Sequence, residues 1–261
     1  MDSPAVLNVP PPPAAAVPAL APHEPLTSYY KPGHKSGFLR GIFDRTAPDY
    51  DRIERIMAFG TGAWYRRQAL LRAGLAPGMK VLDVAAGTGA VSREAIAILG
   101  DPRSVVGLDP SAGMLAELVS RLSIRVVRAT GERLPLADDS FDFLSIGYAL
   151  RHLSDLTAAL AEFRRVLRPG GILCLLEITA PARRIPRALA RGYFRGIVPL
   201  LTRLAASHAD SQLLWRYYWD TIDACIPPAR VLEAMTAAGF TAVDRHVELG
   251  VFSEYTGRNA L

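Results

Sequence analysis

The sequence feature that most constrains the fold is a short apolar run that leads into a glycine-rich turn. Residues 80–84 have the pattern of a buried strand, residues 83–89 read DVAAGTG, and a helical pattern follows over residues 91–99. A glycine-rich turn after a strand lets a ligand approach the backbone where a side chain would collide. An ordinary strand-to-helix turn is the alternative, because a lone GxG also occurs by chance. The segment indicates the floor of a nucleotide-type pocket.

Apolar runs and helical patterns alternate along much of the chain. Further strands are expected at residues 104–109, 124–128, 141–147, 172–178, 241–248 and 251–255, and helices at residues 91–99, 112–122, 156–167 and 229–238. This alternation is typical of the α/β class. We therefore predict a Rossmann-like, mostly parallel seven-stranded sheet flanked by helices. Gly170, after Pro169, is expected to close the helix at residues 156–167 in a left-handed conformation.

Three segments depart from this rhythm. Residues 1–27 are rich in proline and alanine, which favours a disordered tail and leaves residues 28–261 as one domain. Apolar residues between about residue 38 and residue 64 recur at helical spacing, which predicts one or two amphipathic helices. Residues 180–226, called the insertion below, are rich in arginine and aromatic residues. We expect the insertion to form a helical lid before the last helix.

The insertion carries two stripes at helical spacing. The basic stripe is Arg184, Arg187, Arg191 and Arg195, and the apolar stripe is Ile185, Leu189, Tyr193, Ile197 and Leu200. The prolines and glycines at positions 186, 192, 196 and 199 are expected to interrupt the helix. A basic amphipathic surface suits peripheral contact with an anionic membrane. The alternative is a lid that packs its apolar side on the domain and leaves its arginines in solvent.

Charge and cysteine content narrow the partners and the compartment. The net charge of +5 favours anionic surfaces or ligands. Cys174 and Cys225 are the two cysteines and form no CxxC motif, so we expect neither a disulfide framework nor a metal site. The N-terminal residues lack the features of a secretory signal, and the apolar stretches fall short of the roughly 20 residues that a membrane span needs. We expect a cytoplasmic protein, either soluble or at the inner face of the membrane.

An acidic residue at the end of the second strand points to an adenosine. Asp109 follows Gly89 by about twenty residues, a spacing at which a carboxylate accepts hydrogen bonds from the ribose hydroxyls. A dinucleotide fingerprint would place a third glycine where this chain has Ser92. The ligand is therefore expected to carry an adenosine without a pyrophosphate.

Four motifs in order resemble the ubiquinone/menaquinone C-methyltransferase family, the UbiE type: FDRTAPDYD, DVAAGTG, GYALRHLSD and VLRPGG. The resemblance runs from about residue 43 to residue 255. It implies a class I methyltransferase that uses S-adenosylmethionine and releases S-adenosylhomocysteine. The cofactor-binding residues are expected to be Asp83, Ala85, Gly87, Gly89, Asp109, Pro110, Met114, Thr130, Gly131, Glu132 and Gly147.

The chain departs from the family pattern at four positions. It has Ala86 before Gly87 where the family usually has two glycines, and Thr130 where the family has Asp or Asn. It also has His152 and Glu54 where the family has asparagines. The first two changes are compatible with cofactor binding. The last two lie on the side where the acceptor is expected.

The resemblance also indicates the reacting residues. Methyl transfer is an in-line displacement, so the protein mainly supplies alignment and a water-poor pocket. Arg151 is expected to fix an acceptor phenolate or an intervening water, His152 is a candidate base, and Tyr50 is expected to cover the methyl donor. The alternatives are a surface salt bridge from Arg151, a histidine without a catalytic role, and a packing tyrosine. Aromatic residues at positions 215 and 217–219 are expected to line or support the acceptor cavity.

The acceptor is expected to be a small lipophilic aromatic molecule, most simply the ring carbon of a quinol. Methylation of another aromatic or polyketide metabolite is the nearest alternative. Nucleic acid is not expected, because a DNA amino-methylating enzyme would carry (N/D)PP(Y/F) where this chain reads GYALRH. A non-catalytic protein that binds S-adenosylmethionine is a further alternative function. A second copy of the chain, in a homodimer, is a candidate partner.

Overall fold

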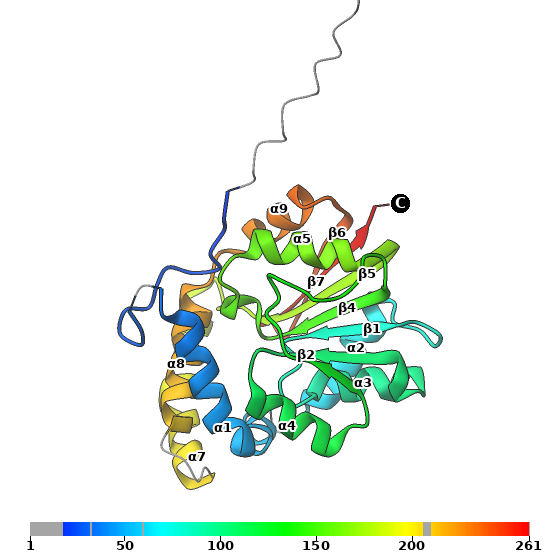
Figure 1. Cartoon of the computed structure of the whole chain (residues 1–261). Coiled ribbons are helices and arrows are strands. Elements are labelled where there is room, and N and C mark those ends of the chain that lie inside the picture. Colours follow the sequence, from blue (N-terminus) through cyan, green and yellow to red (C-terminus); the bar gives the residue numbers. More distant parts are fainter. Residues whose placement is uncertain (1–17, 32, 59, 206–209, 261) are drawn as a thin grey trace, which may run out of the picture.

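The computed structural model describes residues 18–31, 33–58, 60–205 and 210–260. Its centre is one seven-stranded sheet in the order β3-β2-β1-β4-β5-β7-β6 (Figure 1). The strands are β1 (Val81–Val84), β2 (Val105–Leu108), β3 (Arg125–Val127), β4 (Phe141–Gly147), β5 (Leu167–Ile178), β6 (Phe240–Glu248) and β7 (Phe252–Asn259). Strands β1 to β5 are parallel, and β7 pairs antiparallel with both β5 and β6. The predicted sheet is confirmed.

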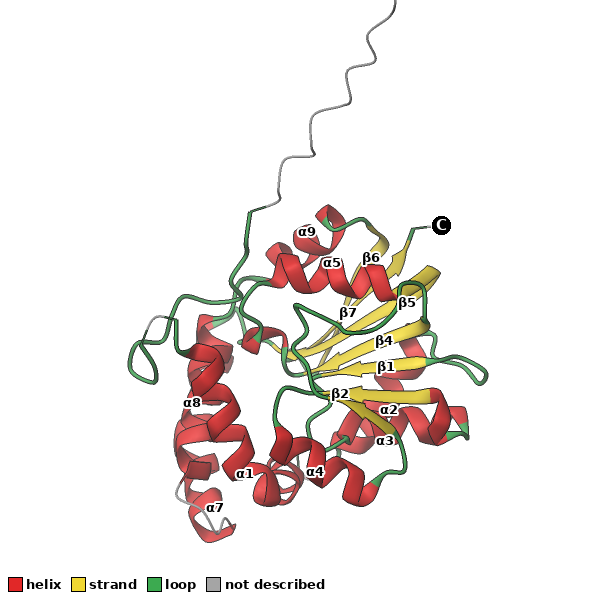
Figure 2. Cartoon of the chain, viewed as in Figure 1, coloured by secondary structure: helices red, strands yellow, loops and turns green. Residues whose placement is uncertain are grey.

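Helices cover both faces of the sheet (Figure 2). One face carries α2 (Gly62–Ala73), α3 (Ala90–Leu99) and α4 (Ala112–Arg121), and the other carries α5 (Leu156–Val166) and α9 (Pro228–Ala237). Short 3-10 turns are η1 (Pro102–Ser104) and η2 (Leu150–His152). In β1, Val81 packs with the helices of the first face and Leu82 with the helices of the second. A continuous apolar run is therefore buried on both sides.

The junction between α5 and β5 differs from the prediction. The helix ends at Val166, and Leu167 already has an extended backbone that starts β5. Gly170 does have a positive φ of 77°, but it lies within β5, where the pairing with β4 shifts register. The glycine therefore forms a bulge in the strand and does not close the helix.

A helical layer lies over the carboxyl ends of the parallel strands. It consists of α1 (Lys35–Met57) and of the insertion, with α6 (Arg184–Gly192), the π-helical η3 (Tyr193–Ile197), α7 (Val198–Ala205) and α8 (Asp210–Ala224). Ile42 and Ile53 of α1 pack with Leu214 and Trp215 of α8. The prolines and glycines that were expected to interrupt the helix of the insertion do not end it. Pro186 lies in the first turn of α6, and η3 joins α6 directly to α7.

In the insertion, the basic stripe faces α8 and most of the apolar stripe faces solvent. Arg187 and Arg191 pair with Asp223, and Arg195 pairs with Asp220, both on α8. The apolar side chains Ile185 and Leu189 are 75% and 70% exposed. Ile197 and Leu200 are also exposed, whereas Tyr193 is half-buried and donates its hydroxyl to the Met57 carbonyl. The alternative in which the apolar side packs on the domain is therefore wrong.

Residues before the predicted domain boundary at residue 28 also pack on the domain. The Leu20 amide donates to Asp155 Oδ1 (3.2 Å), and the Leu20 carbonyl accepts from the Leu156 amide (2.8 Å) at the start of α5. The Pro22 carbonyl accepts from the Ile226 amide (2.8 Å), and His23 is buried. These backbone pairings are invisible in composition, so the expectation of disorder up to residue 27 is wrong for residues 18–27. Residues 1–17 lie outside the described residues.

Candidate functional site

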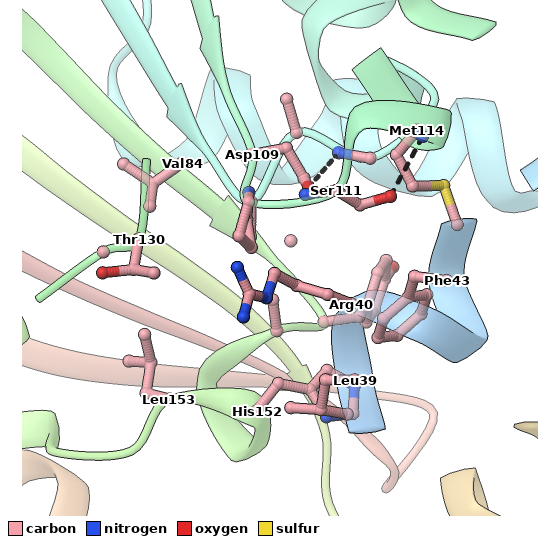
Figure 3. Close-up of a pocket in the computed structure, with 18 of the residues that line it drawn as sticks. Leu39, Arg40, Phe43, Val84, Asp109, Ser111, Met114, Thr130, His152 and Leu153 are labelled. Carbon is pink, nitrogen blue, oxygen red and sulfur yellow. Dashed lines mark hydrogen bonds between the residues drawn. The ribbon is translucent and has the colours of Figure 1, made fainter. Parts of the chain in front are cut away.

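A cavity of about 510 Å³ opens where the carboxyl ends of β1, β2 and β4 meet α1. This is the edge at which ligands bind in open α/β sheets. Of the residues predicted to bind the cofactor, those that line the cavity are Ala85, Gly87, Asp109, Pro110, Met114, Thr130, Gly131, Glu132 and Gly147. Figure 3 shows how side chains from the sheet edge and from α1 converge on this space.

Asp109 sits at the end of β2 and is held in place by two backbone donors. Its Oδ2 accepts from the Gly87 amide (2.9 Å), and its Oδ1 accepts from the Ser111 amide (2.8 Å). Burial raises the pKa of Asp109 to about 6, although these hydrogen bonds act in the other direction. Gly87 has a φ of 55°, and a methyl group placed on it would meet open space. The carboxylate is thus fixed beside a bare backbone turn, as a ribose diol would require.

Asp83 and Gly89 were predicted to bind the cofactor, but neither lines the cavity. Asp83 is fully buried, and its two carboxylate oxygens accept from Ser145 Oγ (2.8 Å) and Ser92 Oγ (2.6 Å). A methyl group on Gly89 would lie 2.7 Å from Leu122 Cδ1 on the far side of the turn. Both residues therefore support the turn from the side away from the cavity. Neither lies where the predicted direct contact with a cofactor would occur.

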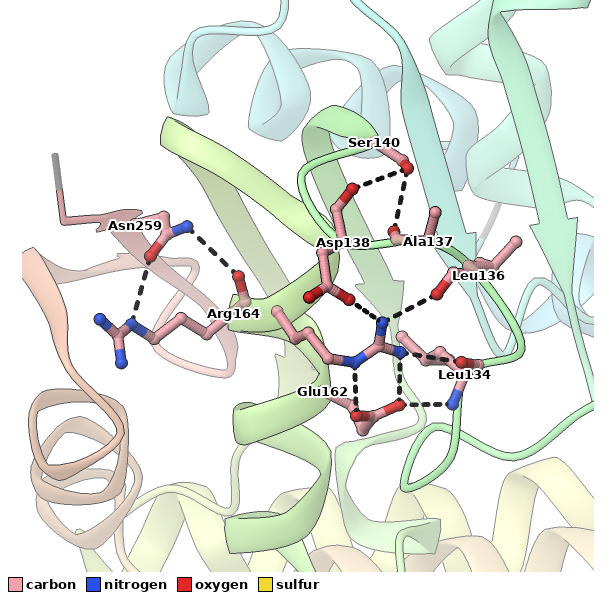
Figure 4. Close-up of polar contacts among 9 residues, drawn as sticks. Leu134, Leu136, Ala137, Asp138, Ser140, Glu162, Arg164 and Asn259 are labelled. Atoms are coloured by element: carbon pink, nitrogen blue, oxygen red, sulfur yellow. Dashed lines mark hydrogen bonds and ion pairs between the residues drawn. The ribbon is translucent and has the colours of Figure 1, made fainter.

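The loop that begins at Thr130, which the resemblance places beside the adenine, is held in place by α5. Thr130 and Arg133 form an isolated bridge, and Glu132 Oε1 accepts from the Ser154 amide (2.6 Å). Farther along the same loop, Arg165 of α5 donates to the Leu134 and Leu136 carbonyls (2.9 and 2.8 Å). The carbonyl of the neighbouring Arg164 accepts from Asn259 (3.2 Å; Figure 4). The loop is thereby fixed by a side chain that no sequence motif had marked.

The opposite end of the cavity lies beyond the last residues of β4. A Cβ on Gly147 would be 2.6 Å from Val91 Cγ2, so only a glycine fits there without movement. Tyr148 follows with a φ of 58°, a strained value for a side chain of this size. Arg66 of α2 lies with its guanidinium carbon 5.4 Å from the Tyr148 ring centre. Both side chains line the cavity, and sequence reasoning missed both.

Aromatic side chains form the wall between these two ends. Tyr50 of α1 and Tyr218 of α8 share a short hydrogen bond between their hydroxyls, and both line the cavity. His152 lies 5.5 Å from the Phe43 ring and 5.6 Å from the Tyr217 ring, centre to centre. The prediction that Tyr50 and His152 lie in the site agrees with these positions. Of the four aromatic residues expected from the insertion, Tyr218 lines the cavity, while the other three pack around it.

The environment of His152 decides its charge. Burial lowers the pKa of His152 well below its usual value, and the neighbouring Arg151 and Lys35 lower it further. The ring is therefore neutral at physiological pH. Neither ring nitrogen has a hydrogen-bond partner among the described residues. Both nitrogens are also buried, so this neutral imidazole forms part of the wall and is not placed to act as a base.

Arg151 lies behind the cavity wall and does not line it. The guanidinium is fully buried, ion-paired with Glu177 through Nη1, and its Nε donates to Thr221 Oγ1 (3.1 Å). Its carbon lies 4.4 Å from the Tyr218 ring centre, a cation–π distance. The alternative of a surface salt bridge from Arg151 is excluded by this burial. The predicted contact between Arg151 and an acceptor does not fit this position either. Arg151 instead packs behind the tyrosine pair that faces the cavity.

Two aspartates attach α1 to the cofactor side of the cavity. Asp44 Oδ1 accepts from Ser111 Oγ (2.6 Å) and from the Gly113 amide (2.9 Å) at the start of α4. Asp51 accepts a hydrogen bond from Thr88 in the glycine-rich turn and pairs with Arg121. In Figure 3 the Arg40 side chain extends from α1 into the cavity. Helix α1 is therefore a fixed cover of the site.

The arrangement suits an elongated ligand with an adenosine at one end. A carboxylate, a bare turn and a polar loop surround one end, Tyr148 and the buried Arg66 lie at the other, and the aromatic wall lies between them. Such a site can align two reactants and exclude water, which is what a displacement at an activated carbon needs.

Sequence comparisons agree with the resemblance. The sequence profile of the ubiE/COQ5 methyltransferase family matches residues 32–258. The "Ubiquinone/menaquinone biosynthesis C-methyltransferase UbiE" of Syntrophotalea carbinolica is 35% identical over 240 residues, which cover 89% of this chain and 97% of that protein. The protein of the same name from Shewanella sp. strain W3-18-1 is 33% identical over 217 residues, or 80% of this chain and 85% of that protein.

Solved structures share the fold at low sequence identity. A SAM-dependent methyltransferase from Thermotoga maritima superimposes with a TM-score of 0.61 at 20% identity and covers 85% of this chain and 99% of its own. The [4+2]-cyclase SpnF superimposes with a TM-score of 0.62 at 17% identity, over 87% of this chain and 96% of its own. Proteins with different reactions thus share this architecture, and the fold alone does not identify the acceptor.

Proposed function

The chain belongs to the ubiE/COQ5 methyltransferase family, and we propose that this S-adenosylmethionine-dependent enzyme methylates a ring carbon of a quinol in ubiquinone or menaquinone biosynthesis. The observation that carries the proposal is the aromatic wall of the cavity. Phe43, Tyr50, His152 and Tyr218 enclose a space suited to a flat aromatic ring. The relatives that bear this activity in their names match most of the chain.

The residues present fit the family's cofactor. Bound S-adenosylmethionine supplies a methyl group that is already activated by its sulfonium. Asp109 would hold the ribose hydroxyls, the bare turn at Gly87 would allow close approach, and the loop at residues 130–132 would border the adenine. Helix α1, attached through Asp44, would exclude water from the reacting atoms.

The acceptor side supplies hydrogen bonding without a strong base. A quinol hydroxyl beside the reacting carbon must release its proton to solvent as the new bond forms, because electron density has to move onto the ring, and the hydrogen on the methylated carbon then leaves as a proton to restore the aromatic ring. The hydroxyls of the Tyr50–Tyr218 pair would bind that hydroxyl, and neutral His152 would form part of the wall against which the ring lies. Arg151 would keep the Tyr218 ring in place from behind.

The test is product formation from a reduced acceptor. Purified protein is incubated with S-adenosylmethionine and chemically reduced demethylmenaquinol or a ubiquinol precursor, and products are analysed by mass spectrometry. We expect a product one methyl group heavier. Tyr218→Phe, which removes one hydroxyl of the pair, should lower kcat by about tenfold while cofactor affinity stays unchanged. His152→Asn, which installs the residue usual in the family, should remain active.

An aromatic or polyketide metabolite other than a quinol is the alternative acceptor. If the protein binds S-adenosylmethionine but methylates none of the quinols, the quinol proposal fails and this alternative takes its place. An absence of cofactor binding would instead favour the non-catalytic protein. Methylation on oxygen, visible in the fragmentation pattern of the product, would likewise contradict transfer to carbon.

We further propose that the enzyme works at the cytoplasmic face of the membrane, where a lipophilic quinol resides. Among the described residues, no helix has the length and apolar character needed to cross a bilayer. The exposed side chains of the apolar stripe, Ile185, Leu189, Ile197 and Leu200, form a surface that would enter the interface between headgroups and acyl chains. Arg183 and Arg184 are exposed next to this surface and would favour anionic headgroups.

Co-sedimentation with lipid vesicles tests this contact. We expect binding to vesicles that contain phosphatidylglycerol, and weaker binding to pure phosphatidylcholine. The triple variant Ile185→Ser, Leu189→Ser and Leu200→Ser should lose most of the bound fraction. The matched control changes exposed apolar residues elsewhere, Leu71→Ser, Val119→Ser and Leu249→Ser, and should bind as the wild type does. Equal loss in both triple variants would contradict a specific membrane-facing surface.

A further inference from the structure

Lys35 is the first residue of α1, and its side chain contacts a different element. Its Nζ donates to the carbonyls of Arg151 (3.3 Å) and Leu153 (2.7 Å) at the carboxyl end of η2. The amino end of a helix carries partial positive charge and disfavours a cation, whereas carbonyls at the end of a helical turn attract one. The contact with η2, rather than helix α1 itself, therefore accounts for a lysine at this position.

η2 belongs to the acceptor side of the cavity. His152 lies in the aromatic wall, and Leu153 lines the cavity beside it. The two carbonyls that Lys35 binds belong to the residues directly before and after His152. A 3-10 turn of three residues has few hydrogen bonds of its own, so a contact from outside adds to its order. Lys35 thus fixes the backbone on both sides of His152.

The same contact lies beside the loop on the cofactor side. The Ser154 amide, which follows Leu153, donates to Glu132 Oε1 (2.6 Å), and Glu132 lines the cavity. The Glu132 carboxylate also attracts the Lys35 ammonium. The end of η2 is therefore held from the loop by Glu132 and from α1 by Lys35.

The surroundings of Lys35 make its charge sensitive to pH. The titratable groups around it are His23 of the segment at residues 18–27, Glu132 of the loop, Cys225 before α9, and Arg151 and His152 of η2. Burial lowers the pKa of Lys35 to about 8, although Glu132 and Cys225 act in the other direction. Burial also lowers the pKa of both histidines, which are therefore neutral at pH 7.5. An ammonium binds carbonyls more strongly than a neutral amine does, so the hold on η2 weakens as the pH rises through about 8.

We propose that Lys35 is a positioning residue for the acceptor, because its ammonium holds η2 so that the wall at His152 closes on the acceptor ring. The proposal rests on the methyl transfer of the proposed function but not on the class of acceptor. Lys35 is not among the described residues that line the cavity, so it acts through η2. Loss of the ammonium should therefore weaken acceptor binding and leave the cofactor side intact.

Steady-state kinetics with saturating S-adenosylmethionine and reduced demethylmenaquinol provide the first test. We expect Lys35→Met to raise the acceptor KM by about tenfold, with kcat and the Kd of S-adenosylhomocysteine within about threefold of the wild type. Lys31→Met, which changes an exposed lysine just before α1, is the matched control and should behave as the wild type does. In the wild type, the acceptor KM should rise as the pH passes about 8. Lys35→Arg, which keeps its charge at higher pH, should remove this rise.

Hydrogen exchange followed by mass spectrometry tests the contact without any acceptor. With S-adenosylhomocysteine bound, we expect the amides of residues 150–154 to exchange at least about tenfold faster in Lys35→Met than in the wild type or in Lys31→Met. Exchange in β1 and β4 should stay unchanged. Failure of the proposed function would appear as an absence of methylation by the wild type, and the exchange measurement would still test the hold of Lys35 on η2.

Three results would overturn the proposal. Unchanged exchange at residues 150–154 would show that Lys35 does not hold η2. Faster exchange throughout β1 and β4 would mean that Lys35 only stabilises the fold. A fall in kcat or in S-adenosylhomocysteine affinity at an unchanged acceptor KM, or a rise of KM with pH that persists in Lys35→Arg, would separate the Lys35 ammonium from acceptor binding.

Discussion

At the scale of single residues, burial sets the chemistry of the site. Asp109 needs its negative charge to accept two hydroxyl groups, yet burial raises the pKa of its carboxyl from 3.8 to about 6. His152 is shifted in the opposite direction and stays neutral. Neither shift follows from the residue type, because each depends on how completely the surrounding elements exclude water.

The raised pKa of Asp109 predicts a pH-dependent cofactor affinity. Below about pH 6 the carboxyl of the free protein takes up a proton and can no longer accept two hydrogen bonds, so affinity for S-adenosylhomocysteine should fall as the pH falls through this value. Titration calorimetry between pH 5 and pH 8 measures the effect. Asp109→Asn should bind more weakly at pH 7.5 and show a flatter profile. A wild-type profile without this decline would contradict the assignment.

Gly147 gives a prediction about packing. Alanine at this position would place its Cβ 2.6 Å from Val91 Cγ2, so we expect Gly147→Ala to lower the free energy of unfolding by about 1–3 kcal/mol. Urea denaturation measures this loss, and adding Val91→Ala should restore part of it. The control is Gly192→Ala, because a methyl group on Gly192 meets open space. Equal stability of Gly147→Ala and the wild type would show that Val91 moves freely.

At the scale of elements, the position of α1 decides whether the sheet edge becomes a closed site. The helix packs on α8 through Ile42 and Ile53, and two carboxylates on its other side bind the elements that hold the cofactor. Asp44 replaces a missing backbone acceptor at the start of α4, as an N-cap does. Cofactor binding and the order of α1 should therefore depend on each other.

Asp44→Ala tests this dependence. Burial acts to raise the pKa of Asp44, but hydrogen bonds from Ser111 and Gly113 hold it below its usual value, so the carboxylate stabilises the fold above its unfolded pKa of about 3.8 and loses this effect at lower pH. We expect a loss of about 1 kcal/mol in unfolding free energy at pH 7. Hydrogen exchange in α1 should become faster, and S-adenosylhomocysteine should bind more weakly.

Asp210→Ala serves as the control for that variant. Asp210 of α8 pairs with Arg45 of α1, the helix that carries Asp44. This pair lies at an exposed position away from the cavity. Exposed ion pairs contribute little, so its effect on exchange and on ligand affinity should be small. If both variants changed α1 equally, the contact with α4 would not be what holds the helix.

At the scale of the whole molecule, the segment at residues 18–27 joins parts that are distant in sequence. It pairs with the start of α5 near Asp155 and with Ile226 just before α9. A few residues farther on, Tyr29 donates to Asp220 Oδ2 (2.6 Å) of α8. The segment thus connects the sheet with the helical layer over the cavity.

Removal of this segment should destabilise the whole protein. A chain that starts at residue 28 loses the backbone pairings of Leu20 and Pro22 and also loses the buried His23 side chain. Relative to a chain that starts at residue 18, we expect a lower Tm, by about 4 °C for each 1–2 kcal/mol lost in a domain of this size. Differential scanning calorimetry measures the shift. Identical Tm values would show that the segment contributes nothing to stability.

The sequence alone determined the sheet, the glycine-rich turn, Asp109 and the family, because these depend on local patterns of strand, turn and charge that tertiary packing does not change. It also placed Tyr50 and His152 at the site through motifs. It could not determine that Asp83 and Gly89 support the turn from behind, that Arg151 is buried, or that the arginines of the insertion face α8.

Those features were decided only by the tertiary structure, because they depend on which face of an element meets another element distant in the sequence. Arg66 illustrates the physical reason. Its position on an apolar helix face hints at burial, but its partner Glu54, its contact with Tyr148 and its free donor arise only when α1, α2 and β4 meet at one point.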